Sequence, residues 1–273
     1  MNSVFKKIVI FILKIVHSKK NIAVIFHNDE DRKVFIDNKI IDENRAWKTS
    51  GSGVDLSVYQ YIPEPDSDIV RILFTARMLR DKGVLELVDA AKILRENYYE
   101  KAQFLFCGDI DDNPRSFTKA ELKNINDGQY VRWLGHRNDI RELLAHSHIF
   151  AFPSYYREGL PKSIIEACAI GRPIVTTNSP GCRDCVVDNY NGYLIPIKDS
   201  KLLASKLAIL IDNKISRISM GKNSRILAEK YFSITDVVDK HMEIYNAFIR
   251  QEKATSSNIF YSDCFEDKNG FCN

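Results

Sequence analysis

The stretch EGLPKSIIEACAIGRPIVTTNSPGCRD, residues 158–184, contains the start of a helix followed by an apolar run. Gly159 permits a close approach of the backbone, and Pro161 suits the first helical position, where the N–H that proline lacks would have no partner. We therefore expect a helix from about Leu160, with free N–H groups at its start. The run RPIVTT, residues 172–177, then predicts a buried strand.

Two glutamates flank this helix start. Glu158 lies in the loop before it, and Glu166 lies about two turns later. A carboxylate accepts hydrogen bonds from vicinal hydroxyls, as the ribose-binding acid of dinucleotide folds does. The pair therefore suits a ligand with phosphates, a ribose and a sugar. The alternative is that Glu158 only complements the helix dipole and that Glu166 is solvated.

Short apolar runs alternate with longer amphipathic segments from residue 71 onward. We expect strands at 71–76, 103–109, 130–135, 148–154, 172–177 and 191–197. Helical spacing of apolar residues predicts helices at 83–97, 199–212, 214–230 and 235–251. This alternation predicts an α/β fold with a Rossmann-like parallel sheet, flanked by helices and joined by right-handed crossovers. Ligands of such sheets bind beyond the carboxyl ends of the strands.

The sequence divides into three parts. Residues 66–252 form the alternating domain, whereas residues 1–65 are the edge of another, incomplete domain and its linker. Within that edge, NIAVIFHNDEDRKVFIDNKII predicts a strand and then a helix capped at Asn28 or Asp29. Residues 253–273 show no sustained period and are expected to form a loosely held C-terminal extension.

The loop after the first strand of the alternating domain, ARMLRDKGV, carries Arg77 and Lys82, five residues apart. A cation pair beside a helix N-terminus forms a good diphosphate clamp, because the helix dipole, the free N–H groups and the side chains all favour anions. Arginine and lysine are also common in surface loops. Taken alone, these two residues favour ordinary solvated charge over phosphate binding.

Composition excludes some classes of function. The formal net charge of +3 comes from 39 basic and 36 acidic residues, which does not suggest a nucleic-acid-binding protein. The six cysteines show no disulfide framework, which favours the cytosol. Cys107 and Cys168 lie in apolar surroundings typical of the core. Cys182 and Cys185 are expected to be loop thiols, with half of a redox or zinc site as the alternative.

The first twenty residues, MNSVFKKIVIFILKIVHSKK, are apolar and basic. The apolar run from Ile8 to Leu13 is too short to span a bilayer, and no small-residue cleavage site follows, as a signal peptide would need. We expect a helix buried against the rest of the fold. The alternative is a basic interfacial helix on a membrane surface.

Residues 158–196 resemble the nucleotide-sugar-binding core of family-4 glycosyltransferases, which are retaining enzymes of the GT-B fold. The paired glutamates, GRPIVTT and GCRDCVVDNYNGYLIP carry the resemblance. GSGVDL, ARMLRDKGV, FCGD and VRWLGHRNDI stand in the family's order, and YFSITDVVDKHMEIY resembles its closing helix. The resemblance runs from about residue 20 to residue 250 and marks residues 66–252 as the C-terminal, donor-binding half of a GT-B fold.

The resemblance implies a donor site. Arg77 and Lys82 would bind the donor diphosphate, and Glu166 would accept hydrogen bonds from the ribose hydroxyls. Glu158 would face the sugar ring, near its C3 and C4 hydroxyls. The other implied donor-binding residues lie beside the base (Gly135, His136 and Arg137) or place their backbone against sugar and phosphate (Gly159, Leu160 and Pro161).

The implied chemistry is transfer of a sugar with retention of configuration. Glu158, Arg77 and Lys82 are expected to act in catalysis, with cations and a helix end stabilising the leaving diphosphate. A UDP-sugar is the expected donor, and neither a metal nor a cofactor is expected. No enzymic nucleophile is needed, since attack from the leaving-group face would retain configuration.

The resemblance also implies partners and a location. The acceptor would be a glycan or a lipid-linked molecule in bacterial capsule or lipopolysaccharide assembly, in the cytoplasm or at the cytoplasmic face of the membrane. About 60 residues precede the donor domain, where the family has well over twice that number. The alternative is a non-catalytic or split nucleotide-sugar-binding subunit, which needs a second chain to supply the N-terminal domain. A nicotinamide oxidoreductase is disfavoured because no G-x-G-x-x-G follows the first strand.

Overall fold

The computed structural model describes residues 3–19 and 22–262, and of residue 3 and residues 250–262 it describes the backbone alone. The chain divides into two compact units, which we describe separately. The larger unit is Ser50–Asp236, and the smaller unit comprises the described residues up to Thr49 and from Val237. The domain boundaries near residues 65 and 252 stay predictions.

The strands and helices of the larger unit follow the predicted order. In chain order they are β3 (Val70–Thr75), η2 (Arg80–Lys82), α3 (Val84–Tyr98), β4 (Ala102–Cys107), α4 (Lys119–Ile125), β5 (Val131–Trp133), α5 (Ile140–Ala145), β6 (Ile149–Phe152), α6 (Lys162–Ile170), β7 (Ile174–Thr177), η3 (Arg183–Cys185), β8 (Gly192–Ile195), α7 (Ser200–Asp212) and α8 (Lys214–Tyr231). The helix expected from about Leu160 begins two residues later, because Pro161 keeps an extended backbone, with ψ of 117°, and caps the helix from outside.

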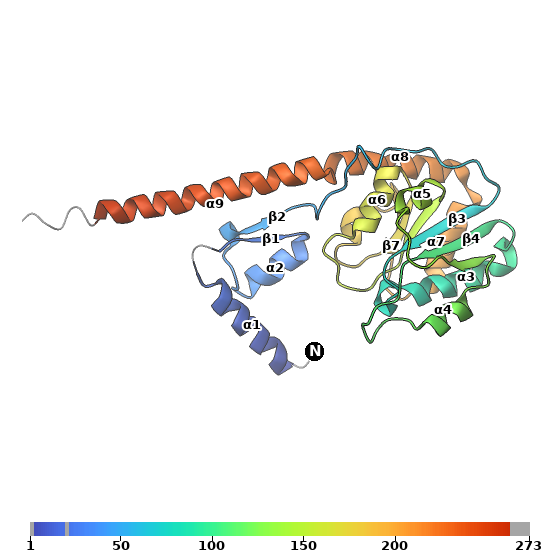
Figure 1. The fold of residues 1–273 in the computed structure, drawn as a ribbon, viewed down its shortest axis with the longest axis horizontal. Helices are drawn as coiled ribbons and strands as arrows, with labels where there is room; N and C mark the ends of the chain where they lie inside the picture. Colours follow the sequence, from blue (N-terminus) through green and yellow to red (C-terminus); the bar gives the residue numbers. More distant parts are fainter. Residues whose placement is uncertain (1–2, 20–21, 263–273) are drawn as a thin grey trace, which may run out of the picture. The chain divides into compact units, whose positions relative to one another are not determined.

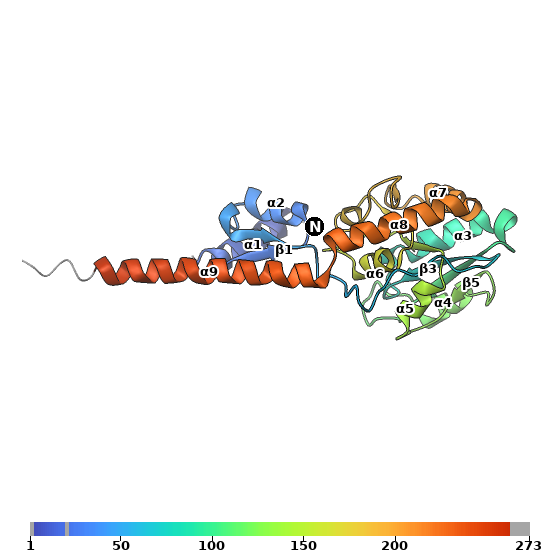
Figure 2. The same ribbon diagram turned by 90° about the horizontal axis from the view of Figure 1, so that it is seen from above.

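The six strands form one parallel sheet in the order β5-β4-β3-β6-β7-β8 (Figure 1). The chain moves outward from β3 to β5 and then returns to the other side of β3 with β6. Helices α3 and α7 lie on one face of the sheet, and α4 and α5 lie on the other (Figure 2). Because both faces are covered, the central strands are buried almost throughout and read as apolar runs in the sequence. The predicted Rossmann-like sheet is confirmed.

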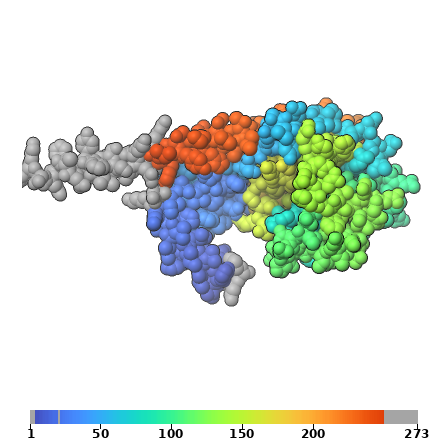
Figure 3. Space-filling model, viewed as in Figure 1, coloured from blue at the N-terminus to red at the C-terminus, as the bar shows by residue number. Residues whose placement is uncertain are grey.

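Residues 60–67 run along the surface of the larger unit without helix or strand (light blue in Figure 3). The segment is held by Arg172, which is only 1% exposed. The Arg172 guanidinium donates hydrogen bonds to the carbonyls of Ile62 and Leu144, both at 2.9 Å. A segment with two prolines, which the sequence marks as a linker, is therefore fixed to the amino-terminal side of the sheet.

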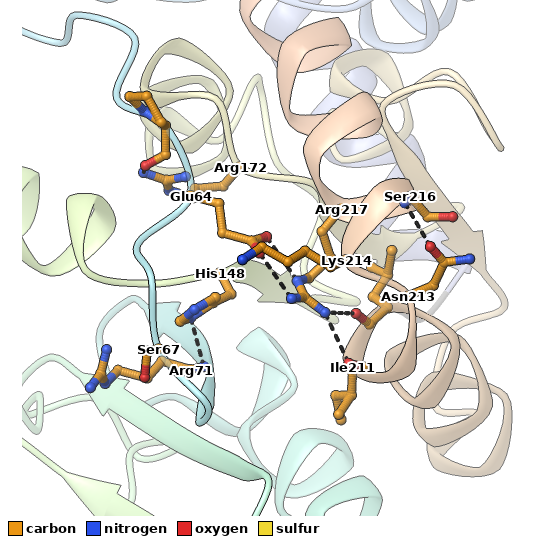
Figure 4. A network of polar contacts seen from close by, with 12 residues as sticks. Glu64, Ser67, Arg71, His148, Arg172, Ile211, Asn213, Lys214, Ser216 and Arg217 are labelled. Atoms are coloured by element: carbon orange, nitrogen blue, oxygen red, sulfur yellow. Dashed lines mark hydrogen bonds and ion pairs between the residues drawn. The ribbon is translucent and has the colours of Figure 1, made fainter.

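A buried ion pair holds the same segment a few residues further on (Figure 4). Arg217 Nε and Nη2 donate to the two carboxylate oxygens of Glu64 at 2.8 and 2.9 Å, and both side chains are 6% exposed or less. Arg217 Nη1 donates to the carbonyls of Leu210 and Ile211. The guanidinium is thus fully engaged, as a buried charge requires.

Replacing Glu64 by glutamine keeps the shape of the side chain and removes the charge that balances Arg217. We expect the free energy of unfolding to fall by about 3 kcal/mol, because a buried charge is then left without its partner. Urea denaturation followed by circular dichroism measures this. Glu229→Gln is the matched control, since its ion pair with Arg225 is 55% exposed on the glutamate side and should contribute less than about 1 kcal/mol. Equal losses in both variants would contradict the assignment.

The smaller unit contains α1 (Ser3–His17), β1 (Val24–Phe26), α2 (Asp29–Asp37), η1 (Glu43–Arg45), β2 (Ala46–Lys48) and most of α9 (Ile234–Ser262). Strands β1 and β2 pair in parallel. The Asn28 side chain accepts a hydrogen bond from the N–H of Asp31 at 2.7 Å, so the predicted cap of α2 is confirmed. Helix α9 continues past residue 252, where the sequence shows no sustained period, and residues 263–273 lie outside the described residues.

The expected burial of the N-terminal helix is wrong. Large apolar side chains along one side of α1 are each more than half exposed: Val4, Phe5, Ile8, Phe11, Ile12, Ile15 and Val16. The opposite side of α1 packs against the rest of the smaller unit. There the ring of His17 contacts the ring of Phe35 edge-on, with ring centroids 5.8 Å apart. Among the described residues, no helix combines the length and the apolar character needed to cross a bilayer.

Candidate functional site

The sheet reverses its strand order between β3 and β6, and parallel sheets bind ligands at such a switch point. The loop after β3 carries Lys82, and the loop after β6 carries Glu158. These two predicted residues form an ion pair, with side chains only 13% and 12% exposed. Residues 76 positions apart in the chain therefore meet at the predicted edge of the sheet.

The contact between the two loops depends on Gly83, which follows Lys82. Gly83 has φ of +83°, and a Cβ at this position would lie 2.2 Å from the carbonyl oxygen of Pro153. The carbonyl of Asp81 accepts hydrogen bonds from the N–H groups of Tyr155 and Tyr156, at 2.9 and 3.0 Å. Only a residue without a side chain permits this approach, so glycine fixes the position of the Lys82 side chain.

The side chains around Lys82 and Glu158 restrict their orientation. Lys82 Nζ lies 5.1 Å from the ring centroid of Tyr156. Ser154 Oγ lies 3.1 Å from Glu158 Oε1, in hydrogen-bonding geometry. On the other side, a Cβ on Gly181 would lie 2.5 Å from the carbonyl oxygen of Gly159, so the loop after β7 packs directly against the backbone that follows Glu158.

Glu166 is half-buried on the first two turns of α6 and hydrogen-bonds to Tyr59. Burial raises the pKa of the Glu166 carboxyl above its usual value, and the bond from Tyr59 partly offsets this. Burial, followed by the charge of Glu166, raises the pKa of Tyr59 to about 12, so the phenol stays protonated and donates. Glu166 is thus not the freely solvated side chain of the alternative interpretation. Tyr59 carried no signal in the sequence, since it lies in a turn-rich segment more than a hundred residues away.

Arg77 does not join Lys82 and Glu158. Its side chain is 62% exposed and pairs with Asp111 from the loop after β4, with Nη1 and Oδ2 2.7 Å apart. The bond from Arg77 lowers the pKa of Asp111 below its usual value. The role of Arg77 in diphosphate binding stays a prediction.

The predicted base loop follows β5, two strands away from β3. Gly135 has φ of +67°, and its carbonyl accepts a hydrogen bond from the N–H of Gly108 at 2.9 Å. His136 and Arg137 are exposed, and Arg137 pairs with Asp139. These residues share the carboxyl edge of the sheet with Lys82 but lie on the β5 side of it.

The four cysteines among the described residues behave as core residues, and Cys264 and Cys272 lie outside the described residues. Cys107 and Cys168 are buried as predicted, and Cys182 and Cys185 are at most 1% exposed. Burial raises the pKa of both Cys182 and Cys185, so neither is a ready thiolate at neutral pH. This disfavours the redox or zinc alternative.

The family model for glycosyl transferases group 1 matches residues 62–226. The chain belongs to this family. The resemblance that the motifs suggested is therefore confirmed, and Lys82, Glu158 and Glu166 lie within the matched region, whereas Tyr59 lies just before it.

Two curated relatives are similar over much of this chain. One is the N,N'-diacetylbacillosaminyl-diphospho-undecaprenol alpha-1,3-N-acetylgalactosaminyltransferase of Campylobacter jejuni, 35% identical over 180 residues, which cover 63% of this chain and 46% of the relative. Another is the UDP-Gal:alpha-D-GlcNAc-diphosphoundecaprenol alpha-1,3-galactosyltransferase of Escherichia coli, 29% identical over 246 residues, which cover 85% of this chain and 62% of the relative. The chain thus spans about half to two thirds of the length of these relatives.

Solved structures share the fold. A glycosyltransferase from Rickettsia africae superposes with a TM-score of 0.77 at 23% identity, covering 87% of this chain and 66% of that one. Anabaena HepE in complex with UDP superposes with a TM-score of 0.72 at 20% identity, covering 82% and 64%. These likenesses confirm the predicted fold class.

Tyr59→Phe removes the hydroxyl that donates to Glu166. A hydrogen bond donated to a carboxylate favours its charged form, so we expect the pKa of Glu166 to rise further in this variant. A pH titration of the ¹³C carboxyl resonance of Glu166 measures it. Tyr99→Phe, which removes a surface hydroxyl bonded to Gln129, should leave this pKa unchanged. An unchanged pKa in Tyr59→Phe would show that the bond does not tune the carboxyl.

Proposed function

We propose that this chain is the donor-binding part of a retaining glycosyltransferase, which transfers a sugar from a UDP-sugar to a glycan or lipid-linked acceptor in bacterial surface polysaccharide synthesis. The observation that carries the proposal is the ion pair of Lys82 and Glu158 at the switch point of the sheet. The Lys82 ammonium, which can bind phosphates, and the Glu158 carboxylate, which can accept hydrogen bonds from sugar hydroxyls, lie together at this point. The start of α6 and the carboxyl of Glu166 lie further along the same loop and helix.

The names of relatives and neighbours support the choice of substrates. Both curated relatives are named for acceptors in which a diphosphate joins a sugar to undecaprenol, and one is named for the donor UDP-Gal. Structures of HepE contain UDP or UDP-glucose. A lipid-linked acceptor lies in a membrane, so in this proposal the chain works at a membrane surface, and we expect the cytoplasmic face.

Lys82 acts on the leaving group in this proposal. Its ammonium has three N–H donors, of which one faces Glu158, so the others can reach phosphate oxygens. The free N–H groups at the start of α6 add partial positive charge on the same side. Negative charge grows on the diphosphate as the bond to the sugar breaks, and fixed positive charge stabilises that state without a metal.

The two carboxylates orient the donor. Glu158 is held by Lys82 and Ser154 and can accept hydrogen bonds from sugar hydroxyls. Glu166 is held by Tyr59 and can accept from the ribose hydroxyls. Such positioning raises the rate by holding the anomeric carbon in one place relative to the acceptor.

Lys82→Ala and Glu166→Ala should each weaken UDP-N-acetylglucosamine binding at least tenfold, because each removes a charged contact to the donor. Isothermal titration calorimetry at pH 7.5 measures the affinity. Lys92→Ala is the control, since Lys92 pairs only at the surface with Asp89. EDTA should change none of these affinities.

Unchanged affinity in both site variants would show that the donor site is assigned wrongly. Wild-type binding without sugar transfer to a lipid-diphosphate acceptor would instead favour the non-catalytic or split subunit that needs a second chain. The matched part of the chain covers only 46% and 62% of these two relatives, which is compatible with this alternative.

We also propose that α1 lies on an anionic membrane surface. Its exposed apolar side is bordered by Lys7 and Lys14, the helix also carries Lys6, and residues 3–19 contain no acidic side chain. An exposed apolar side with basic flanks is typical of helices that lie in the interface of a membrane with anionic lipids.

The double substitution Ile8→Glu and Phe11→Glu should lower binding to phosphatidylglycerol vesicles more than tenfold, since it places charge on the apolar side of α1. Co-sedimentation with the vesicles measures it, and vesicles of phosphatidylcholine should bind wild-type protein only weakly. Ile215→Glu is the control, because Ile215 is 81% exposed on α8. Equal binding of the double variant and the wild type would refute membrane attachment through α1.

A further inference from the structure

Hydroxyl side chains continue the contact between β6 and β7 beyond the point where the two strands stop pairing. The last paired residues are Phe152 and Thr176, and Pro153, which has no N–H, follows β6. Thr176 Oγ1 donates to the carbonyl of Phe152 at 2.6 Å, and Thr177 Oγ1 donates to the carbonyl of Ser154. The loop after β6 is thus fixed to the end of β7 by side chains where backbone pairing has ended.

A second hydroxyl supports the bond from Thr177 to Ser154. Ser179 Oγ lies 2.8 Å from Thr177 Oγ1 and 3.2 Å from the carbonyl oxygen of Ser154. All three side chains are buried. A hydrogen bond in such surroundings is stronger than one in water, because the local dielectric constant is low. The position of Ser154 is therefore set by the end of β7 and the loop that follows it.

The hydroxyl of Ser154 has one proton and two acceptors within reach. Its Oγ lies 3.1 Å from Glu158 Oε1 and 3.2 Å from the carbonyl oxygen of Asp81. The Asp81 carbonyl already accepts hydrogen bonds from the N–H groups of Tyr155 and Tyr156, which use both of its lone pairs. The Tyr156 N–H also donates to Ser154 Oγ at 3.2 Å. The Ser154 proton therefore goes to the Glu158 carboxylate, whose charge strengthens the bond.

This bond restricts how the Glu158 carboxylate can turn. Lys82 and Ser154 both donate to its Oε1. Lysine has a flexible four-carbon stem, whereas the serine hydroxyl is one bond away from a backbone that β7 holds in place. The Ser154 hydroxyl therefore fixes the direction of the carboxylate more strictly than the ammonium does. A carboxylate held in one direction can distinguish sugar hydroxyls by their configuration, whereas a carboxylate that turns can accept from either epimer.

We propose that Thr177 and Ser179 are positioning residues, which act through Ser154 to fix the carboxylate of Glu158 and thereby select the donor sugar by its configuration at C4. The inference rests on the proposed function, in which Glu158 accepts hydrogen bonds from sugar hydroxyls. It adds a determinant of sugar choice that lies at the end of β7. Since both hydroxyls are bonded within the interior, they act on the sugar only through Ser154 and Glu158.

The test compares the affinities of the full chain for UDP-N-acetylglucosamine and UDP-N-acetylgalactosamine, which differ only in configuration at C4. Isothermal titration calorimetry measures both, with UDP as the reference ligand. We expect the wild type to bind one of the two about tenfold more tightly, and the double variant Thr177→Val, Ser179→Ala to reduce this preference below about threefold. The affinity for UDP, which lacks the transferred sugar, should stay the same in both proteins.

Controls separate positioning from a general loss of buried hydrogen bonds. The double variant Ser147→Ala, Thr176→Val removes the same two kinds of hydroxyl, each buried and each donating to a backbone carbonyl. It should lower the thermal unfolding midpoint as the first double variant does and leave the C4 preference unchanged. Thr177→Ser keeps the hydroxyl and should keep the preference, whereas Ser154→Ala should lose it. These two single variants decide the inference if the first double variant does not fold.

Equal preference in the wild type and the double variant of Thr177 and Ser179 would overturn the inference. Equal affinity of the wild type for the two UDP-sugars would also overturn it, as would an equal loss of preference in the control variant of Ser147 and Thr176. Failure of UDP itself to bind would refute the proposed function. Binding of UDP with a C4 preference that does not depend on these hydroxyls refutes this inference alone.

Discussion

The backbone contact between the loop after β3 and the loop after β6 is the constraint on which the site depends. Strands β3 and β6 are hydrogen-bonded neighbours, with Ile72 opposite Ile149, although a large part of the domain lies between them in the chain. Their loops leave the same edge of the sheet and touch where Gly83 has no side chain. Lys82 and Glu158 are thereby brought together with little exposure, which strengthens the attraction between them.

The two edges of the sheet use charge in different ways. At the amino-terminal edge, Arg172 and Arg217 are buried and their donors are taken up by carbonyls and by Glu64, so they fix the segment 60–67 (Figure 4). At the carboxyl edge, Lys82 and Glu158 form an ion pair at the switch point of the sheet, which is where ligands of such sheets bind.

The strand order also spreads the predicted donor residues along one edge of the sheet. The predicted base loop follows β5, whereas Lys82 and Glu158 lie in the loops after β3 and β6. In the proposed reaction the donor therefore extends along this edge, with its base toward β5 and its sugar toward β6.

The sequence by itself determined the order of strands and helices and limited the cap of α2 to Asn28 or Asp29, because periodicity and capping are local properties. It also placed Lys82 and Glu158 in loops at one edge of the sheet and Glu166 in the helix that follows, whereas their roles in donor binding stay predictions. The start of α6 was misplaced by two residues because Pro161 alone does not show which side of the helix boundary it occupies. Only the tertiary structure decided that Lys82 pairs with Glu158 and Arg77 with Asp111, that Tyr59 bonds to Glu166, and that α1 exposes its apolar side. Those facts depend on which strands are neighbours and on what covers each surface, and both are set by packing between residues far apart in the chain.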